Sequence, residues 1–383
     1  MIQPPAFEIL HQDSGCGARR AVLTAAHGRV QTPAFMPVGT AGAVKGITPW
    51  QLEESGADII LANTYHLLLR PGIDVVEGLG GIHKFMAWQK PILTDSGGYQ
   101  IFSLSQVPKR GKRSSRRPLT KITDDGVEFI SHVDGAKVYL NPQLATKIQN
   151  RLAADIIMCL DQCTAFGCGA HQLEEAVERT VRWARACKGA HTNADQLLFA
   201  VVQGGIDPSL RRHCASELVK LGFDGYAIGG LSVGEGHGDM MRTVSLLTGA
   251  PSILPENKPR YLMGVGTPAD IIAAVRAGVD MFDCVLPTRN GRNAFAFADN
   301  GPVRLRNNAH ISSAEPIEAG CDCYCCGNFT RAAVRHFFNA GEMLGPILVS
   351  LHNLRFYQRL MAKIREVIER DEFDDWADEQ LKK

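Results

Sequence analysis

The feature that most constrains the fold is a series of eight short apolar runs separated by longer amphipathic stretches. Such runs are typical of parallel strands buried on both faces, and the amphipathic stretches are typical of the helices that cover them. The alternation predicts an α/β protein with a (β/α)8 barrel, or TIM barrel. A doubly wound open sheet remains the alternative, because spacing alone does not show closure. The expected strands are residues 34–38, 58–62, 91–94, 156–160, 197–202, 225–228, 260–264 and 281–286.

The composition excludes several classes of protein. The chain has 383 residues, 45% of them hydrophobic, and can bury one large core or two ordinary ones. No window approaches about 18 uninterrupted apolar residues and no signal-peptide pattern is present, so we expect a cytoplasmic protein without a membrane span. In that reducing setting, 11 cysteines indicate thiols and metal ligands rather than a disulfide framework. A net charge of +1 means that any nucleic-acid contact must come from local patches.

Polar residues stand at the ends of several expected strands. In a barrel, the carboxyl ends of all strands meet at one face, where active sites form. Any one such residue is more often a cap or a turn residue, but five polar ends at one face fit a site for a small molecule. The five are Asp95, Asp161, Gln203, the pair Gly229 and Gly230, and Asp283.

The segment 103–140 interrupts the barrel rhythm after the third strand. Its second half alternates polar and apolar residues around Asp-Gly turns, which predicts a small inserted β-meander. Its first half carries six positive charges between Lys109 and Arg117. These charges suit either a solvated loop or a flap that binds phosphate groups.

A compact cysteine motif lies near the C-terminus. Cys321, Cys323 and Cys326 form a C-x-C-x-x-C pattern, and His352 follows later. Three thiolates and one imidazole complete the tetrahedral shell of a zinc ion, and Cys325 is an alternative ligand. Four protein ligands leave no open position, so we expect one structural zinc per chain. It would stabilise a C-terminal helical subdomain (301–383) packed on the catalytic barrel (1–300).

Asp283 and Cys284 compete for the role of nucleophile within the eighth expected strand, residues 281–286. Alternation along a strand points neighbours to opposite sides, so only one of them faces the barrel interior. A thiol nucleophile needs a base such as histidine, and no expected strand end carries one. A carboxylate needs no base to attack an oxocarbenium-like sugar carbon, which favours Asp283.

Seven separated motifs carry a family resemblance. They are DSGGYQIFSLS (95–105), MCLDQCT (158–164), VVQGG (201–205), YAIGGLSVGE (226–235), YLMGVGTP (261–268), MFDCVLPTRNGRN (281–293) and the cysteine pattern. Together they resemble the queuine tRNA-ribosyltransferase family, or tRNA-guanine transglycosylases, of the bacterial type. The resemblance runs from about Phe7 to the C-terminal helix. It implies a homodimeric, zinc-containing barrel that exchanges guanine at anticodon position 34 of a tRNA for a 7-deazaguanine.

The resemblance implies roles for the residues at the strand ends. Asp283 matches the nucleophile that forms a covalent intermediate with the ribose of the tRNA. Asp95 matches the general acid/base, which protonates the departing base and deprotonates the incoming one. Asp161 and Gln203 match residues that read the purine edge, and the backbone amide of Gly230 is expected to face the carbonyl oxygen of the base.

Other matched positions are expected to surround the flipped nucleotide. Tyr99 and Met263 match the residues that sandwich the base, which must leave its stack before the chemistry begins. Arg289 and Arg292 are expected to hold the neighbouring phosphates of the tRNA.

Substrate choice is inferred from the residues that close the pocket. Cys163 and Val233 match the bacterial-type pocket, which has no room for a bulky cyclopentenediol group. This pocket favours 7-aminomethyl-7-deazaguanine. Glu235 is expected to steady the loop from Leu231 to Val233, so that a carbonyl meets the aminomethyl cation.

Two further hypotheses belong to other classes. A non-catalytic tRNA-binding subunit of the same family is disfavoured by the presence of Asp95, Asp161, Gln203 and Asp283. An unrelated zinc hydrolase barrel would need metal ligands, typically histidines, at the strand ends, and the expected strands lack them. The basic stretch departs from the family pattern as an insertion between Gln106 and Leu119, so the resemblance implies no role for it.

Overall fold

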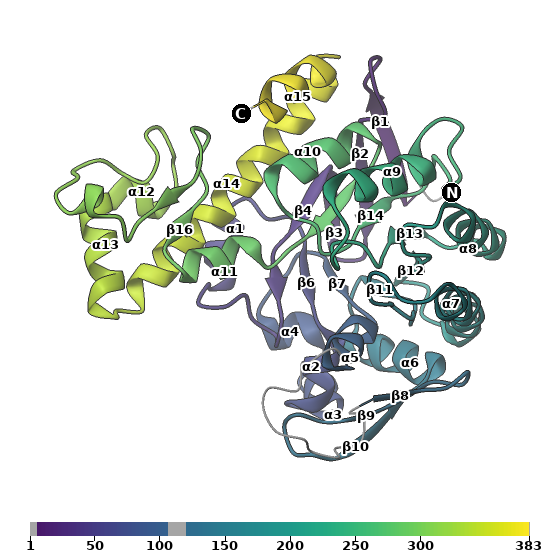
Figure 1. Cartoon of the computed structure of the whole chain (residues 1–383). Helices are drawn as coiled ribbons and strands as arrows, with labels where there is room; N and C mark the ends of the chain where they lie inside the picture. The colour runs from purple at the N-terminus through teal and green to yellow at the C-terminus, as the bar shows by residue number, and fades with distance from the viewer. Residues whose placement is uncertain (1–5, 106–119, 383) are drawn as a thin grey trace.

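The computed structural model describes residues 6–105 and 120–382, and its central feature is a closed parallel barrel (Figure 1). Barrel strands pair in the order β4-β15-β14-β13-β12-β11-β7-β6-β5. β4 (Ala34–Met36) and β5 (Val38–Gly39) are two halves of the first expected strand, separated by Pro37, which has no N–H to donate to a ladder. The sheet therefore begins and ends on the same stretch of chain. This closure confirms the barrel and excludes the open sheet.

Each of the other seven expected runs contains one barrel strand. They are β6 (Ile60–Ala62), β7 (Ile92–Thr94), β11 (Ile156–Met158), β12 (Leu197–Val202), β13 (Gly225–Ile228), β14 (Arg260–Leu262) and β15 (Met281–Asp283). The eighth strand ends at Asp283 rather than at residue 286, because α11 (Leu286–Arg292) begins there with a proline in its first turn. This early end places both arginines of the TRNGR motif on a helix instead of a loop.

Helices cover the outside of the barrel. They are α1 (Pro49–Glu54), α2 (Thr64–Leu69), α3 (Ile73–Gly78), α4 (Ile82–Met86), α5 (Gly98–Ser105), α6 (Pro142–Leu152), α7 (Ala170–Ala190), α8 (Pro208–Leu221), α9 (His237–Thr248) and α10 (Pro268–Arg276). From α6 to α10 each helix contacts the next, and α14 (Leu344–Glu369) contacts both α10 and α1. The long helix α14 therefore takes the place of the eighth barrel helix.

An antiparallel sheet outside the eight expected strands closes the amino-terminal end of the barrel. It consists of β1 (Phe7–Gln12), β2 (Arg19–Ala25) and β3 (Gly28–Thr32). Its buried residues Phe7, Leu23 and Val30 share one apolar cluster with residues of the barrel interior such as Met158 and Tyr261. The sheet does not cover the opposite end of the barrel, where the carboxyl ends of the strands can form the site.

The inserted β-meander is confirmed. β8 (Thr120–Ile122), β9 (Val127–Ile130) and β10 (Lys137–Leu140) form an antiparallel sheet. Its first turn is anchored to α7, where Arg179 and Arg182 each approach Asp124 Oδ1 to 2.9 Å. Its second turn is anchored to α2, because Tyr65 hydrogen-bonds His132 at 2.9 Å. The basic stretch that precedes the meander, residues 109–117, lies outside the described residues.

The C-terminal part forms a lobe beside the barrel (Figure 1). It contains β16 (Phe295–Ala296), β17 (Val303–Arg304), a short 3-10 helix (Asn308–His310), α12 (Tyr324–Asn328) and α13 (Arg331–Ala340), followed by α14 and α15 (Phe373–Leu381). The lobe has a separate apolar cluster. Since α14 contacts α12 and α13 as well as barrel helices, it joins the lobe to the barrel. The division at residue 300 stays a prediction.

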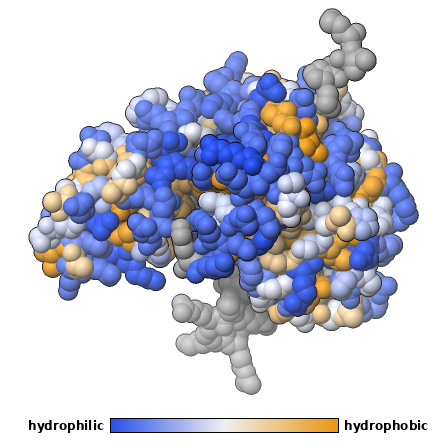
Figure 2. Space-filling view, turned by 90° about the horizontal axis from the view of Figure 1, so that it is seen from above, coloured by the Kyte–Doolittle hydropathy of each residue, from blue (hydrophilic) through white to orange (hydrophobic). Residues whose placement is uncertain are grey.

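One face of the molecule is mainly polar (Figure 2). Figure 2 shows a face on which hydrophilic residues dominate and hydrophobic residues lie in small separate groups. Among the described residues, no helix is both long enough and apolar enough to cross a membrane.

Candidate active site and metal centre

Three aspartates lie close enough to influence one another at the carboxyl end of the barrel. Burial raises the pKa of Asp95 to about 6, and the charge of Asp283 adds to this rise. Burial also raises the pKa of Asp161 to about 6, and the charge of Asp95 contributes. The barrel therefore brings together the carboxylates that follow β7, β11 and β15.

Asp95 is held by residues from two neighbouring elements. Its Oδ2 accepts hydrogen bonds from Asn63 Nδ2 at 2.6 Å and from Gln100 Nε2 at 2.7 Å. Its Oδ1 accepts one from the backbone N–H of Thr64 at 2.8 Å. These donors lower the pKa of Asp95 and oppose the effect of burial. The carboxyl group therefore stays fixed while its pKa remains near neutral pH, as an acid/base group requires.

Asp283 is held through only one of its two carboxylate oxygens. Its Oδ1 accepts hydrogen bonds from Tyr261 Oη at 2.6 Å and from Gly264 N–H at 2.8 Å. No described residue donates to Oδ2, so this oxygen is available for attack. Burial raises the pKa of Asp283, while both donors oppose the rise. Cys284 packs against the core outside the barrel, as alternation along a strand predicts.

Asp161, Gln203 and the Gly229-Gly230 turn form one connected polar edge. Gln203 Nε2 donates to Asp161 Oδ2 at 2.6 Å. A Cβ at Gly230 would lie 2.3 Å from Gln203 Oε1, and Gly230 has a φ of +64°, so only glycine fits there. The N–H of Gly230 has no acceptor among the described residues. The edge therefore presents a carboxylate, an amide oxygen and a free backbone donor.

A carboxylate holds the loop that follows this turn. Glu235 accepts hydrogen bonds from the N–H of Ser232 and, at 3.0 Å, from the N–H of Val233. In a trans peptide the C=O points away from the N–H, so the carbonyl of Leu231 faces away from Glu235. Cys163 is buried close by, and burial raises the pKa of its thiol to about 12, so the thiol stays neutral.

Tyr99 and Met263 come from different elements. Tyr99 lies on α5, and its side chain is 53% exposed. The charges of Arg289 and Asp283 act on the pKa of Tyr99, which burial raises, so its ring lies near these groups. Met263 is half-buried and directly precedes Gly264, a donor to Asp283.

Arg289 and Arg292 lie on α11, which begins just after Asp283. Neither guanidinium has an ion-pair or hydrogen-bond partner among the described residues, and Nη1 of Arg292 is buried without one. Burial and the charge of Arg289 lower the pKa of Arg292. Two unpaired guanidinium groups beside the site suit an anionic ligand.

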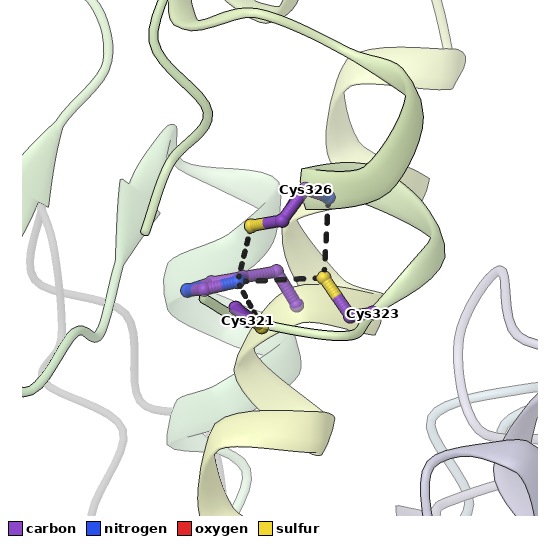
Figure 3. Close-up of side chains that lie close together, drawn as sticks. Cys321, Cys323 and Cys326 are labelled. Carbon is purple, nitrogen blue, oxygen red and sulfur yellow. Dashed lines mark hydrogen bonds between the residues drawn. The ribbon is translucent and has the colours of Figure 1, made fainter. Parts of the chain in front are cut away.

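The cysteine motif forms a metal-binding group with His352. The three thiols converge on Nδ1 of the imidazole, at 3.7 Å from Cys321, 3.6 Å from Cys323 and 3.3 Å from Cys326 (Figure 3). His352 Nε2 donates to the carbonyl of Phe297 at 2.6 Å, which turns the lone pair of Nδ1 toward the thiols. This donor set fits a structural metal ion. Cys325 is not part of it; its side chain is fully buried in the apolar cluster of the lobe.

A second group of potential ligands is better explained by direct contacts to one carboxylate. His27 Nδ1 and His83 Nε2 approach the two oxygens of Asp155 to 2.9 and 3.0 Å. Ligands of one tetrahedral zinc ion would lie about 3.3 Å apart, given metal–ligand distances of about 2.0 Å. Asp155 also accepts from the backbone N–H groups of His27 and Ile92, both at 2.8 Å. We interpret this group as a link between the amino-terminal sheet and the barrel.

Comparisons with known proteins identify a family for this chain. A family model for queuine tRNA-ribosyltransferase matches residues 13–383. The chain belongs to this family. Curated relatives named queuine tRNA-ribosyltransferase include those of Syntrophobacter fumaroxidans, 49% identical over 97% of this chain and 95% of the relative, and Nitrosomonas europaea, 51% identical over 94% and 93%. The relative from Thiobacillus denitrificans is 48% identical over 97% of this chain and 96% of its own length.

Sequence reasoning missed the residues that hold the carboxylates of Asp95 and Asp283. Asn63 and Thr64 directly follow the second expected strand, so the rule that selected Asp95 could have selected them as well. Tyr261 lies within an apolar run and shows no signal of its own. Its role depends on the pairing of β14 with β15, which places it beside Asp283.

Proposed function

We propose that this chain is a tRNA-guanine transglycosylase that replaces guanine at anticodon position 34 with 7-aminomethyl-7-deazaguanine. One observation carries the proposal: Asp283 is held through Oδ1 alone and lies within electrostatic reach of Asp95. A nucleophilic carboxylate beside an acid/base carboxylate is the pair that retaining glycosyl transfer needs.

In the first half-reaction, Oδ2 of Asp283 attacks C1′ of the ribose. The C1′–N9 bond breaks and its electron pair stays on the departing guanine, which takes a proton from Asp95. Because burial raises the pKa of Asp95 to about 6, this carboxyl group can both give and take a proton near neutral pH. The product is a tRNA joined to Asp283 by an ester.

The second half-reaction reverses these steps with a different base. Asp95 removes the proton from N9 of the incoming deazaguanine, and N9 attacks C1′. The bond between C1′ and the oxygen of Asp283 breaks, and its electron pair returns to the carboxylate. The ester retains the energy of the glycosidic bond, so no nucleotide cofactor is required.

The polar edge suits a 2-amino-6-oxopurine. The carboxylate of Asp161 would accept from the N–H groups of the base, and the N–H of Gly230 would donate to the carbonyl oxygen, with Gln203 between them. Tyr99 and Met263 would stack on the two ring faces. The exposed ring of Tyr99 is compatible with that role.

The neighbouring loop suits an aminomethyl group on the base. The carbonyl of Leu231, turned away from Glu235, would accept from the ammonium group. Cys163 and Val233 would close the space that a larger substituent needs. These residues are the basis for preferring 7-aminomethyl-7-deazaguanine.

Contacts to the rest of the tRNA would be electrostatic. Arg289 and Arg292 have no protein partners in the described part of the chain and would hold phosphates beside nucleotide 34. The basic stretch 109–117 would add to this footprint. We propose a cytoplasmic homodimer, as the family resemblance implies. Exposed apolar side chains in the lobe, namely Ile311, Tyr324 and Met343, support an interface there.

The metal that we propose for Cys321, Cys323, Cys326 and His352 is zinc, which prefers this thiolate and imidazole set. It would hold the lobe in its folded form. All four ligands come from the protein, so the site has a structural role.

Incorporation of radiolabelled guanine tests the proposal. Purified protein and a tRNA with guanosine at position 34 should give labelled tRNA without any nucleoside triphosphate. 7-Aminomethyl-7-deazaguanine should compete with the label at lower concentration than unlabelled guanine does. Bound but unlabelled tRNA would instead support the non-catalytic subunit. The unrelated zinc hydrolase is already excluded by the family match.

A further inference from the structure

Arg211 is a fully buried arginine that has no carboxylate partner among the described residues. It lies on α8, and its three hydrogen bonds all go to backbone carbonyls at the ends of β12 and β13. Nη1 donates to Val202 O at 2.7 Å, Nη2 to Gly229 O at 2.8 Å and Nε to Gly205 O at 2.7 Å. Burial lowers the pKa of Arg211 only to about 10, so the guanidinium is charged at neutral pH.

One of these carbonyls belongs to the peptide that faces the pocket. Gly229 C=O and Gly230 N–H are the two ends of a single trans peptide, so they point in opposite directions. Arg211 binds the carbonyl end. The N–H end lies beside Gln203, whose Oε1 would be 2.3 Å from a Cβ at Gly230, and it has no acceptor among the described residues.

A purely structural role does not require a charge at this position. Burying a guanidinium costs free energy, and neutral donors could satisfy carbonyls at lower cost. Negative charge near the guanidinium offsets part of this cost. The charge of Glu235 raises the pKa of Arg211, and the pocket on the other side of the turn holds Asp161.

We propose that Arg211 positions and polarises the Gly229-Gly230 peptide, so that the N–H of Gly230 stabilises negative charge on the carbonyl oxygen of the departing base. This inference rests on the proposed function. When the C1′–N9 bond breaks, its electron pair delocalises over the purine onto that oxygen. The hydrogen bond and the cation at the other end of the peptide strengthen this donor. It therefore stabilises the developing negative charge more than it stabilises the neutral base of the ground state. Arg211 is therefore a positioning residue that acts through Gly230.

The test uses bases of graded acidity. Guanine, 8-azaguanine and 7-deazaguanine differ in the acidity of the ring N–H that is lost on incorporation. Each base crosses the same transition state when it joins the ribose as when it leaves. Rates of incorporation into tRNA are measured for wild type, Arg211→Met and Arg211→Lys. Arg212→Met is the matched control, because Arg212 neighbours it on the same helix with an exposed side chain.

We expect Arg211→Met to lower kcat roughly 10- to 100-fold with guanine, with KM within about 3-fold of wild type. The substitution weakens the Gly230 donor without removing it, whereas complete loss of an oxyanion donor costs about 100-fold or more. The fold-decrease in kcat should be smallest for the most acidic base and largest for 7-deazaguanine. Arg211→Lys, which keeps the charge, should recover part of the rate, and Arg212→Met should match wild type.

A loss of the same factor for all three bases would overturn the inference and leave Arg211 a structural residue. So would an unchanged kcat in Arg211→Met. Partial unfolding of a variant does not obscure the result, because the ratio of rates between bases is measured on one preparation. Wild-type incorporation of guanine tests the proposed function separately, since it does not depend on Arg211.

Discussion

Replacing Tyr261 with phenylalanine removes one hydroxyl from the support of Asp283. This hydroxyl donates to Asp283 Oδ1 at 2.6 Å, and the side chain is fully buried in the barrel interior. A hydrogen bond to a charged acceptor contributes about 1.5–3 kcal/mol. Because one pKa unit corresponds to about 1.4 kcal/mol, its loss should raise the pKa of Asp283 by about one to two units.

The sign of the effect on activity follows from the role of Asp283. The nucleophile must be ionised, so activity falls as the pH drops through the pKa of Asp283. Burial already raises this pKa, and the hydrogen bond from Tyr261 opposes the rise. In Tyr261→Phe the acidic limb of the kcat/KM profile should therefore move to higher pH by about one to two units. Above the shifted limb the rate should approach that of wild type.

The assay is incorporation of labelled guanine into tRNA between pH 5 and pH 9.5. Tyr226→Phe is the control, because Tyr226 is equally buried and its hydroxyl accepts from Phe223 N–H at 3.2 Å, away from Asp283. Its acidic limb should match that of wild type. An unchanged limb in Tyr261→Phe, with the fold intact, would refute the reasoning, because another group would then control the acidic limb.

Three other perturbations have defined outcomes. Asp283→Asn should keep the fold and tRNA binding but reduce exchange at least about 1000-fold, and turnover near wild type would remove Asp283 from the mechanism. Cys323→Ala should release one metal ion per chain and lower Tm by several degrees, whereas Cys325→Ala should retain the metal; an unchanged Tm after verified metal loss would contradict the structural role. Removing residues 109–117 should weaken tRNA affinity and flatten its dependence on salt, and equal salt slopes would indicate a loop without phosphate contacts.

The fold could be predicted from the sequence where burial leaves a regular pattern of apolar residues. The eight barrel strands are buried on both faces, so each one is a continuous apolar run, and their strand ends identify Asp95, Asp161 and Asp283. The amino-terminal sheet leaves no such signal, because only one face of it packs on the barrel and β1 is largely exposed.

Residues that act through other residues could not be predicted. Arg211 and Arg212 are adjacent arginines in one amphipathic helix, and nothing in the sequence shows that one of them is fully buried beneath a strand-end turn. The role of Tyr261 likewise arises from pairing between strands. Such roles depend on contacts across the barrel, whereas sequence periodicity reports only which face of an element is buried.

The sheet that closes the amino-terminal end of the barrel limits how substrates can travel. Its apolar side chains pack against the barrel interior, so small molecules cannot pass through the barrel and must use its carboxyl end. Under the proposed mechanism the tRNA occupies that same end throughout the reaction. The outgoing and incoming bases must then pass one after the other through a single opening that the tRNA partly covers. Guanine release and deazaguanine entry are therefore mutually exclusive events, and free guanine should inhibit competitively against the incoming base.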